Sequence, residues 1–588
     1  MSLRGFRQIR PMKPIAKNTS DFPTLIRDGQ IYVDKTRFFH RMVTDRQDKY
    51  FFLARPRRFG KTLMLSTLKA IFEGRRDLFA GLDIDKTDYD WKKYPVLSFN
   101  FGQVATSSLD EFDATFPDCI KTSFDEAGIG YDPHSRPSTN FRNAILELNA
   151  RNNGHGVVVL IDEYDDPAAK SLNDIAQAEA VRNRLGDFYA QLKDRTDAVR
   201  FLMITGVSKF TKMSVFSTLS NMTDISLKDQ YAIMLGYTDE ELDVYFDEQM
   251  RVQADMMRLD YAEYRRQLKW WYNGFRFTPG CRTTLYNPIS IAMTLAEPER
   301  QFAATWIETG RPSMLMNYLN RFALVEAMSR RKLASVSEDE FDVSNMNSLK
   351  PVGMLFQTGY LTIRDYNPDT RLYTLDVPDE EIRRDVALLL VDAMADRETG
   401  WASRLGNHLR AANWPEFFDG LSALYAKMCY GPNEKLVHEY SYARILHVLL
   451  ASQGLHVAQE ETTANGRSDI VAEYAGGVFI FELKKETVAK QPASRQNAAG
   501  GGEEQKRGVV TTPSSSDEDI APRREGGLDG NLAIASKDKC ADAAFAQIDE
   551  RGYAKPYLSS SRPVWAIALV FDSDTRQLVD AQVKAIIP

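Results

Sequence analysis

The chain has 588 residues, of which 43% are hydrophobic and 26% are charged, as in ordinary soluble proteins with roughly two to four domains. Its formal net charge of −7 argues against the strongly basic proteins that coat DNA regardless of sequence, although a local basic groove is compatible with it. The four cysteines are far apart and form no CxxC pair, which argues against a zinc knuckle or a disulfide framework and favours a reducing, cytoplasmic setting.

The first residues and the apolar stretches do not have the patterns of a secreted or membrane protein. Residues 1–17 are basic but include no apolar run, so we expect no signal peptide. The longest strongly apolar stretches, such as 157–161, are far too short to span a bilayer, so we expect no membrane partner. Residues 1–30 are interpreted as an N-terminal arm that packs on the first domain.

Residues 31–235 alternate short apolar runs with helical patterns, which predicts a parallel α/β domain of the P-loop NTPase type. The runs are apolar on both faces, as expected of strands in the middle of a parallel sheet. Apolar residues recur with helical spacing over 62–73, directly after the first run. The predicted strands are 50–54, 96–101, 157–161 and 201–205.

The residues between the first predicted strand and its helix have the composition of a loop that binds nucleotide phosphates. Such a loop needs converging backbone N–H groups, a helix N-terminus, a lysine and a hydroxyl group that binds Mg²⁺. We expect Lys61 to contact the β- and γ-phosphates of ATP and Thr62 to bind Mg²⁺. The usual pattern has glycine at the position of Arg55, which leaves the path of the loop open. The candidate nucleotide-binding residues of the loop are Arg57, Arg58, Phe59, Gly60, Lys61 and Thr62.

Two further predicted strands end in polar residues. The run 157–161 is followed by Asp162, which we expect to hold Mg²⁺ through water, and by Glu163, the candidate catalytic residue that orients or polarises the attacking water. At the end of the fourth predicted strand, either Thr205 or Ser208 is expected to sense the γ-phosphate, and Ser208 is counted among the nucleotide-binding residues.

Each half of this nucleotide site is weak evidence when it is taken alone. Acidic residues at the end of an apolar strand are common, and a GKT triplet occurs by chance. Both occur here in the expected order, on predicted strands of one α/β segment, and together they predict nucleotide binding. Arg57 and Arg58 either contact phosphates or form a solvated basic loop, and the sequence does not separate the two.

The sequence predicts mostly helices in the middle of the chain. Residues 236–345 are predicted as a helical domain, with helices over 239–257 and 265–272. Residues 346–430 are predicted as a winged-helix-like and helical linker region. Within it, a helix precedes a hairpin whose turn is Asn367-Pro368-Asp369 and whose strands are 358–363 and 371–375.

Residues 431–588 are predicted as a second α/β domain with a candidate metal site. Metal-assisted cleavage of a phosphodiester needs carboxylates that hold divalent ions and a group that stabilises charge. Alternate side chains of a strand share a face, so Glu482 and Lys484 point the same way. Hairpin pairing would bring Asp469 beside Glu482, and Glu439 opens the preceding helix. We assign Glu439, Asp469 and Glu482 to the metal, and Asp469, Glu482 and Lys484 to catalysis, with Lys484 stabilising charge or orienting water.

The alternative for this cluster is an ordinary hairpin with a surface salt bridge. The strand before Glu482 is apolar on both faces, however, and a buried carboxylate and lysine at its end are costly without partners. Gln547 is either a further polar contributor or a solvated helix residue. Residues 487–538 are rich in Gly, Ser, Ala and charge, and we interpret them as a disordered insertion.

Several of these motifs together resemble a known family. The chain is similar to the bacterial AAA-ATPase-like family that carries a C-terminal PD-(D/E)XK nuclease-superfamily domain. In that family the phosphate loop typically reads RPRRFGK followed by Ser or Thr, so Arg55 is as the family has it. The insertion is the clear departure. The resemblance rests on the segments 32–36, 55–62, 160–165, 205–210, 271–275, 286–288, 466–470, 481–484 and 547–548 and on Tyr553.

The resemblance implies an ATP-binding domain and a nuclease-like domain, with ATP and Mg²⁺ as cofactors. We therefore expect an ATP-binding, ATP-hydrolysing protein whose C-terminal domain acts on nucleic acid, with DNA favoured as the partner. ATPases of this general type often assemble so that a neighbouring copy completes the site, so a homo-oligomer is also considered. The alternative is an ATP-controlled switch or binding protein whose nuclease-like domain does not cleave.

Overall fold

The computed structural model divides the chain into two compact units, residues 1–393 and 394–588. The prediction for Asp469 and that for residues 487–529 of the insertion lie outside the described residues, and the side chain of Glu439 is not described. Apart from short gaps, the described residues are 12–209, 222–304, 333–341, 351–394, 400–428, 439–459, 470–486 and 530–588.

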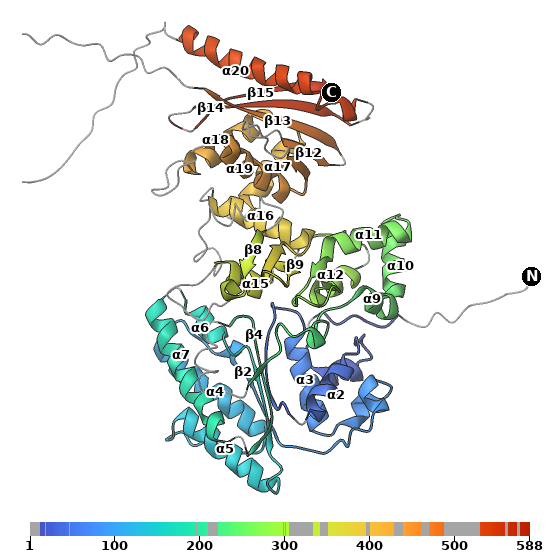
Figure 1. Ribbon diagram of the computed structural model, residues 1–588, viewed down its shortest axis with the longest axis vertical. Coiled ribbons are helices and arrows are strands. Elements are labelled where there is room, and N and C mark those ends of the chain that lie inside the picture. The colour runs from blue at the N-terminus through green and yellow to red at the C-terminus, as the bar shows by residue number, and fades with distance from the viewer. Residues whose placement is uncertain are drawn as a thin grey trace, which may run out of the picture. The chain divides into compact units, whose positions relative to one another are not determined.

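A five-stranded parallel sheet forms the centre of the first unit (Figure 1). Every residue of its β1 and β3 is buried, which is why these strands are continuous apolar runs in the sequence. All four predicted strands are confirmed to within two residues at each end. The short fifth strand was not predicted, because two residues carry no pattern. In order across the sheet the strands are β2 (Val96–Asn100), β3 (Val157–Asp162), β4 (Val199–Gly206), β1 (Tyr50–Ala54) and β5 (Thr223–Asp224).

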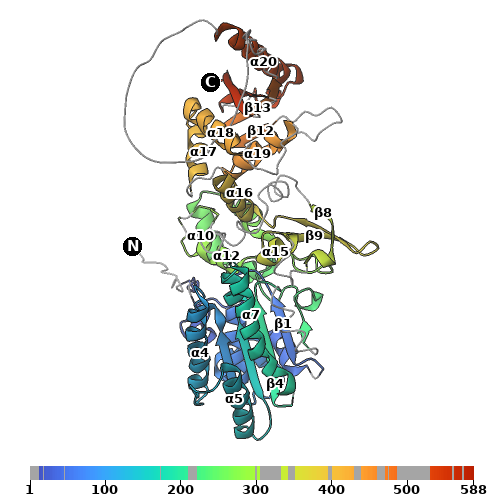
Figure 2. The ribbon, with the colours of Figure 1, turned by 90° about the vertical axis from the view of Figure 1, so that its left-hand side faces the viewer.

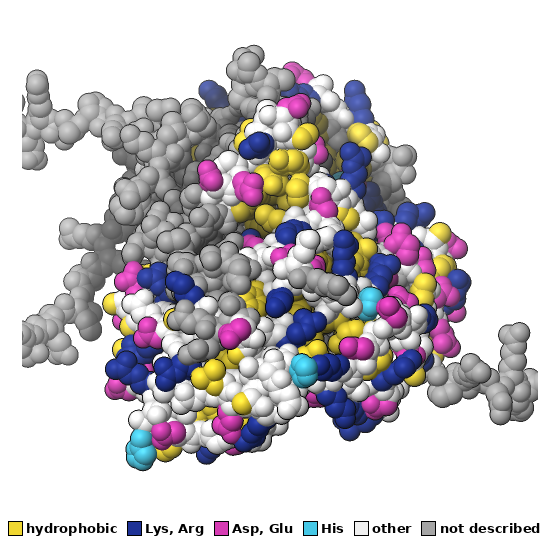
Figure 3. Space-filling view, turned by 60° about the horizontal axis from the view of Figure 1, so that its bottom comes forward, with side chains coloured by type: hydrophobic (Ala, Val, Ile, Leu, Met, Phe, Trp, Pro, Cys, Tyr) yellow, Lys and Arg dark blue, Asp and Glu magenta, His cyan; other side chains and the backbone are white. Residues whose placement is uncertain are grey.

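Helices cover both faces of this sheet (Figures 1 and 2). One face carries α2 (Thr36–Thr44) and α3 (Lys61–Phe72), and the other carries α4 (Leu109–Glu126), α5 (Pro137–Arg151) and α7 (Ile175–Tyr189). A core of buried aromatic and aliphatic side chains fills the space under α4, α5 and α7. Figure 3 shows Lys and Arg side chains interspersed with Asp and Glu over the face it draws, in keeping with the small net charge.

The carboxyl ends of β1, β3 and β4 meet at one edge of the sheet. The register pairs Ala54 with Gly206 and Ile161 with Ile204. Ligands of open α/β sheets bind outside the carboxyl ends of the strands. Because β4 lies between β1 and β3, its last residues stand between the loop that follows β1 and the acidic end of β3.

Helices predominate among the described residues 239–295, and the predicted helical domain over 236–345 stays a prediction. The predicted helix 239–257 is in fact two helices, because the backbone leaves the helical conformation at Phe246, where φ is −128° and ψ is 6°. A two-stranded sheet of β6 and β7 follows the third helix. The elements are α9 (Asp239–Tyr245), α10 (Asp247–Met256), α11 (Tyr261–Tyr272), β6 (Asn273–Phe275), β7 (Leu285–Tyr286) and α12 (Pro288–Leu295).

A three-stranded antiparallel sheet and one long helix complete the first unit. The predicted hairpin is present, but its first strand begins at Thr362 because the preceding helix extends through Thr358. The third strand, β8, was not predicted, and the likeness to a winged helix stays a prediction. The elements are β8 (Leu333–Ser337), α15 (Pro351–Thr358), β9 (Thr362–Asn367), β10 (Leu372–Asp376) and α16 (Glu380–Met394).

The second unit is a mixed five-stranded sheet with the order β11-β12-β13-β14-β15. Of its neighbouring strands, only β13 and β14 are parallel to each other. The last helix begins at Gly530, so residues 530–538, predicted to belong to the insertion, are helical instead. The elements are α17 (Trp401–Arg410), α18 (Trp414–Met428), α19 (Glu439–Ser452), β11 (His456–Gln459), β12 (Ile470–Tyr474), β13 (Gly477–Glu486), α20 (Gly530–Arg551), β14 (Val564–Asp572) and β15 (Leu578–Ile587).

None of the helices within the described ranges is both long enough and apolar enough to cross a membrane.

A buried ion pair ties the segment before α2 to α9 in the first unit. The Lys35 ammonium donates to both oxygens of the Glu241 carboxylate, at 2.6 and 2.7 Å, and to the backbone oxygen of Ile233 at 2.8 Å. Glu241 also accepts from the backbone N–H of Thr238 and closes the capping box of α9. Burial lowers the pKa of Lys35, and the Glu241 carboxylate opposes that shift.

We expect Lys35→Met to lower the free energy of unfolding of the first unit by about 3 kcal/mol, because it leaves a buried carboxylate without its cation. Lys69→Met is the matched control, since it breaks an exposed pair with Glu126 and should cost less than about 1 kcal/mol. Urea denaturation of the full chain measures both values. Equal losses in the two variants would contradict this account of the buried pair.

Candidate functional site

The loop after β1 leads into α3 through a residue that has the left-handed conformation. Gly60 has φ 90° and ψ 21° and is the N-cap of α3. Glycine adopts this conformation without a steric penalty, so the chain can turn sharply into the helix there. The first backbone N–H groups of α3 have no partners within the helix and point toward the loop, which is how helix N-termini bind phosphates.

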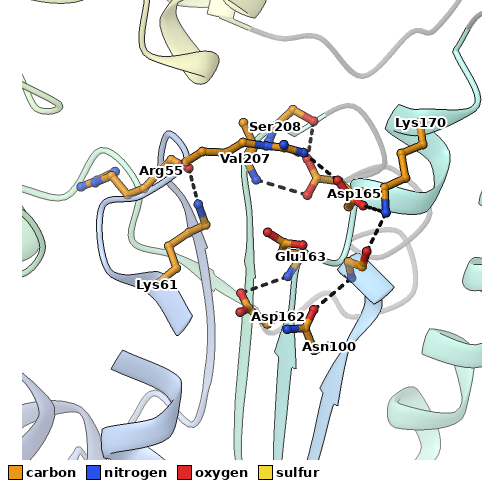
Figure 4. Close-up of polar contacts among 12 residues, drawn as sticks. Arg55, Lys61, Asn100, Asp162, Glu163, Asp165, Lys170, Val207 and Ser208 are labelled. Atoms are coloured by element: carbon orange, nitrogen blue, oxygen red, sulfur yellow. Dashed lines mark hydrogen bonds and ion pairs between the residues drawn. The ribbon is translucent and has the colours of Figure 1, made fainter. Parts of the chain in front are cut away.

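Lys61 is buried beneath the loop. Its ammonium donates to the backbone oxygens of Arg55 and Pro56, both at 2.9 Å (Figure 4). Burial lowers the pKa of Lys61, while the carboxylates of Asp162 and Glu163 act in the opposite direction. The lysine that the sequence assigns to the phosphates is therefore already held in the loop by two carbonyl groups.

The Asp162 carboxylate, at the end of β3, accepts hydrogen bonds from residues of β4 and of the helix α3 that follows β1. Its Oδ2 accepts from the Thr62 hydroxyl at 2.6 Å, and its Oδ1 accepts from the Thr205 hydroxyl at 2.6 Å. The backbone N–H of Glu163 also donates to Oδ1, at 3.0 Å. Thr62 lies in the first turn of α3 and Thr205 lies on β4. The structure thus brings together the hydroxyl and the carboxylate that the sequence assigns to Mg²⁺.

Glu163 has an unusual backbone and a partly buried carboxyl group. Its φ of 50° is uncommon for a residue that has a Cβ, and such conformations cluster at functional sites. Burial raises the pKa of Glu163, and the nearby carboxylates of Asp166 and Asp162 raise it further. The carboxyl group lies against Gly102, where an added Cβ would be 1.7 Å from Oε2.

Ser208 has a different partner from the one that the sequence suggested. Its hydroxyl and its backbone N–H donate to Oδ2 of Asp165, at 2.6 and 2.7 Å. Both residues are buried, and burial raises the pKa of Asp165. Gly206 makes room for this contact, because a Cβ there would lie 2.4 Å from Asp165 Oδ1. Of the two candidates for sensing the γ-phosphate, Thr205 is the one that contacts Asp162.

The remaining loop residues differ in their surroundings. Arg57 donates to Asp166 Oδ1 at 2.7 Å, and Arg58 is exposed with a φ of 66°. The ring of Phe59 is buried against Phe275 and Phe277, with centroid distances of 4.8 and 5.1 Å. Only the backbone of Phe59 is therefore available to a nucleotide.

In the second unit, Glu482, Lys484 and Gln547 lie together. The Lys484 ammonium donates to Glu482 Oε1 at 2.8 Å and to the Gln547 side-chain oxygen. Glu482 is only 2% exposed, and its Oε2 has no hydrogen-bond partner among the described residues. Within the same residues, no three His, Cys, Asp or Glu side chains are arranged to hold a metal ion. The predicted set with Glu439 and Asp469 is not tested by this result.

Two contributors to the nucleotide site, Asn100 and Asp166, were missed by sequence reasoning. The Asn100 side chain accepts from the N–H of Gly102 at 3.0 Å and shapes the turn against Glu163. Asp166 binds the cations Arg57 and Lys170. Asn100 lies near the end of the predicted strand 96–101 and is paired with Asp162 across the sheet, so its place at a strand end was the available signal.

Comparisons with known proteins support the nucleotide-binding part of this picture. Residues 16–216 match the model of the family described as "Predicted AAA-ATPase". The chain is 29% identical over 573 residues to an "Uncharacterized protein in vnfD 5'region" of Azotobacter chroococcum mcd 1, which covers 95% of this chain and 96% of that protein. The first unit therefore contains an AAA-ATPase-like domain, and the matched region ends before residues 394–588.

One solved structure also aligns with the chain: "Structure of the Aeropyrum Pernix ORC2 protein (ADPNP-ADP complexes)". The identity is 10%, the alignment covers 65% of this chain and 97% of the other, and the TM-score is 0.23. A score this low does not establish a shared fold.

We expect Gly102→Ala to lower the rate of ATP hydrolysis by about tenfold or more, because the added methyl group forces the Glu163 carboxyl group to move. ATP affinity should change by less than about twofold, since the hydrogen bonds of Gly102 join it to Asn100 and Lys170 and not to the loop. Gly130→Ala is the control, because an added Cβ there meets open space. Steady-state hydrolysis and equilibrium ATP binding measure the two effects. A Gly102→Ala variant that hydrolyses ATP like Gly130→Ala would contradict the role of this contact.

Proposed function

We propose that the first unit binds and hydrolyses ATP with Mg²⁺, and that the second unit is a metal-dependent nuclease. One observation supports the first half of this proposal: a hydroxyl in the first turn of α3 donates to the carboxylate that ends β3, with 2.6 Å between Thr62 Oγ1 and Asp162 Oδ2. These are the two side chains that a site for a nucleotide and its Mg²⁺ requires at that place.

The residues of the first unit suit ATP and Mg²⁺ in their chemistry. Mg²⁺ prefers oxygen ligands and retains water, and Thr62 and Asp162 offer a hydroxyl and a carboxylate. The N-terminus of α3 and the Lys61 ammonium would hold the phosphates. When bound, Mg²⁺ neutralises part of the charge on the phosphate oxygens. Because Lys61 is buried and its ammonium donates to two carbonyl groups of the loop, it is already oriented toward the loop.

Glu163 is the residue proposed to handle the proton in hydrolysis. A general base works best when its pKa lies near the operating pH, and burial beside Asp162 and Asp166 raises the pKa of Glu163 in that direction. Thr205, which is bonded to Asp162, is proposed in place of Ser208 as the residue that responds to the γ-phosphate. Arg58 is proposed as a phosphate contact, since its side chain is exposed at the loop.

The nuclease proposal is supported by the cost of burying Glu482. A carboxylate that is 2% exposed, with one oxygen lacking a partner among the described residues, is expensive unless it serves a metal or a proton. The register of β12 and β13 places Ile470 opposite Phe481, which are the sequence neighbours of Asp469 and Glu482. That register favours the proposed pairing of Asp469 with Glu482. Glu439 and Asp469 would complete the metal ligands, and Lys484 would stabilise charge.

A cleavage assay tests the nuclease proposal. The substrates are labelled single- and double-stranded DNA and RNA, with Mg²⁺ or Mn²⁺ and with or without ATP. We expect cleavage that Glu482→Gln reduces by about a hundredfold or more, because the buried carboxylate would be a metal ligand. Glu550→Gln, on the exposed face of α20, is the matched control and should cut like the wild type.

Lys61→Ala should abolish ATP binding, and its effect on cleavage reports whether the two sites are coupled. If the wild-type protein binds ATP but cuts no substrate with either metal, the nuclease proposal is wrong. The protein would then be an ATP-controlled switch or binding protein. If Glu482→Gln and Glu550→Gln cut equally well, the cleavage does not come from this site.

A further inference from the structure

Arg55 stands where the usual phosphate loop has glycine, yet its side chain does not face the phosphate site. Figure 4 shows the guanidinium group pointing away from Asp162 and Glu163. Arg55 is 3% exposed, so the group is buried in the protein. Burial lowers the pKa of Arg55 to about 9, and the group still carries its charge at neutral pH.

Hydrogen bonds fix Arg55 at several atoms. Its backbone N–H donates to Gly206 O at 3.1 Å, which ties the start of the loop to the end of β4. Its Nη1 donates to the backbone oxygens of Ala54 at 3.1 Å and Ser226 at 2.5 Å. Its own carbonyl oxygen accepts from the Lys61 ammonium at 2.9 Å. The Arg55 backbone oxygen therefore binds Lys61, while the Arg55 side chain is itself bound to Ser226.

The same side chain packs against a segment outside the AAA-ATPase-like domain. The Arg55 guanidinium carbon lies 4.4 Å from the centroid of the Phe277 ring, which is a cation–π contact in a buried place. Phe59, at the other end of the loop, packs against the same ring and against Phe275. Residues 275–277 lie beyond the matched residues 16–216, so both ends of the loop rest on a segment that the family model does not cover.

We propose that Arg55 is a positioning residue for Lys61. Anchored on Ser226 and Phe277, it fixes the carbonyl group that orients the Lys61 ammonium, and it thereby makes the ATP affinity of the loop depend on the ring of Phe277. The proposal rests on the ATP site proposed above. Where a conventional loop would be shaped by glycine, this loop is shaped by a buried side chain.

Equilibrium binding of a fluorescent ATP analogue to the full-length protein tests the proposal. We expect Arg55→Gln and Phe277→Leu each to weaken ATP binding by about tenfold, because each removes the anchored cation–π contact. The double variant should bind not much more weakly than either single variant, since both substitutions break one shared interaction. Arg55→Lys should recover part of the affinity, because lysine keeps the charge over the Phe277 ring.

Arg276→Gln is the matched control. Arg276 lies beside Phe277 and also donates to backbone oxygens, those of Thr278 at 3.1 Å and Arg364 at 2.9 Å, but none of its hydrogen bonds reaches the loop. It should lower the melting temperature without changing the ATP affinity. If Arg276→Gln weakens ATP binding as much as Arg55→Gln does, the effect is general destabilisation and the proposal is wrong.

Unchanged ATP affinity in Arg55→Gln would also overturn the proposal. If kcat falls while the affinity stays unchanged, Arg55 is instead a contact of the reacting groups. Phe277→Leu, a milder change, decides the matter if Arg55→Gln does not fold. Failure of the wild-type protein to bind the analogue would instead remove the proposed ATP site, so the two failures are distinguishable.

Discussion

The hydrogen bond from Thr62 to Asp162 is the contact on which the proposed chemistry of the first unit depends. It requires that β1 and β3 lie in one parallel sheet, with their carboxyl ends at the same edge and only β4 between them. Thr205 of β4 completes the arrangement by bonding the other oxygen of the same carboxylate. A shift of β3 by one residue would turn Asp162 to the other face of the sheet and lose both contacts. The buried apolar strands therefore fix the site as well as the core.

The phosphate loop packs against residues that lie outside the AAA-ATPase-like domain. Arg55 and Phe59 both pack on Phe277, and the neighbouring Arg276 binds the backbone of β9 through Arg364. Gly274, in the same segment, lies so close to Pro378 that an added Cβ would be 1.7 Å from its backbone oxygen. Pro378 stands just before α16, the last helix of the first unit. The segment 273–277 thus contacts the loop, the three-stranded sheet and the approach to α16.

Sequence reasoning predicted the elements that local patterns determine and missed those that depend on distant partners. The strands of the parallel sheet, the helix after the loop, and the meeting of Thr62 with Asp162 follow from apolar runs and from the order of motifs. The burial of Phe59 and the turning of Arg55 away from the site depend on Phe277, more than 200 positions later in the chain, and no local pattern reports such contacts. Ser208 looked like a nucleotide contact because it follows a strand end, but Asp165 takes both of its donors.

The most direct test of the central claim is the Mg²⁺ dependence of ATP binding and hydrolysis in the wild-type protein and in Asp162→Asn. If Thr62 and Asp162 form the metal side of an ATP site, the wild type should hydrolyse ATP only with Mg²⁺, and Asp162→Asn should lose about a hundredfold or more of that activity. Isothermal titration calorimetry should show Mg²⁺ strengthening ATP binding in the wild type but not in the variant. Hydrolysis and binding that are the same in both proteins would contradict the account.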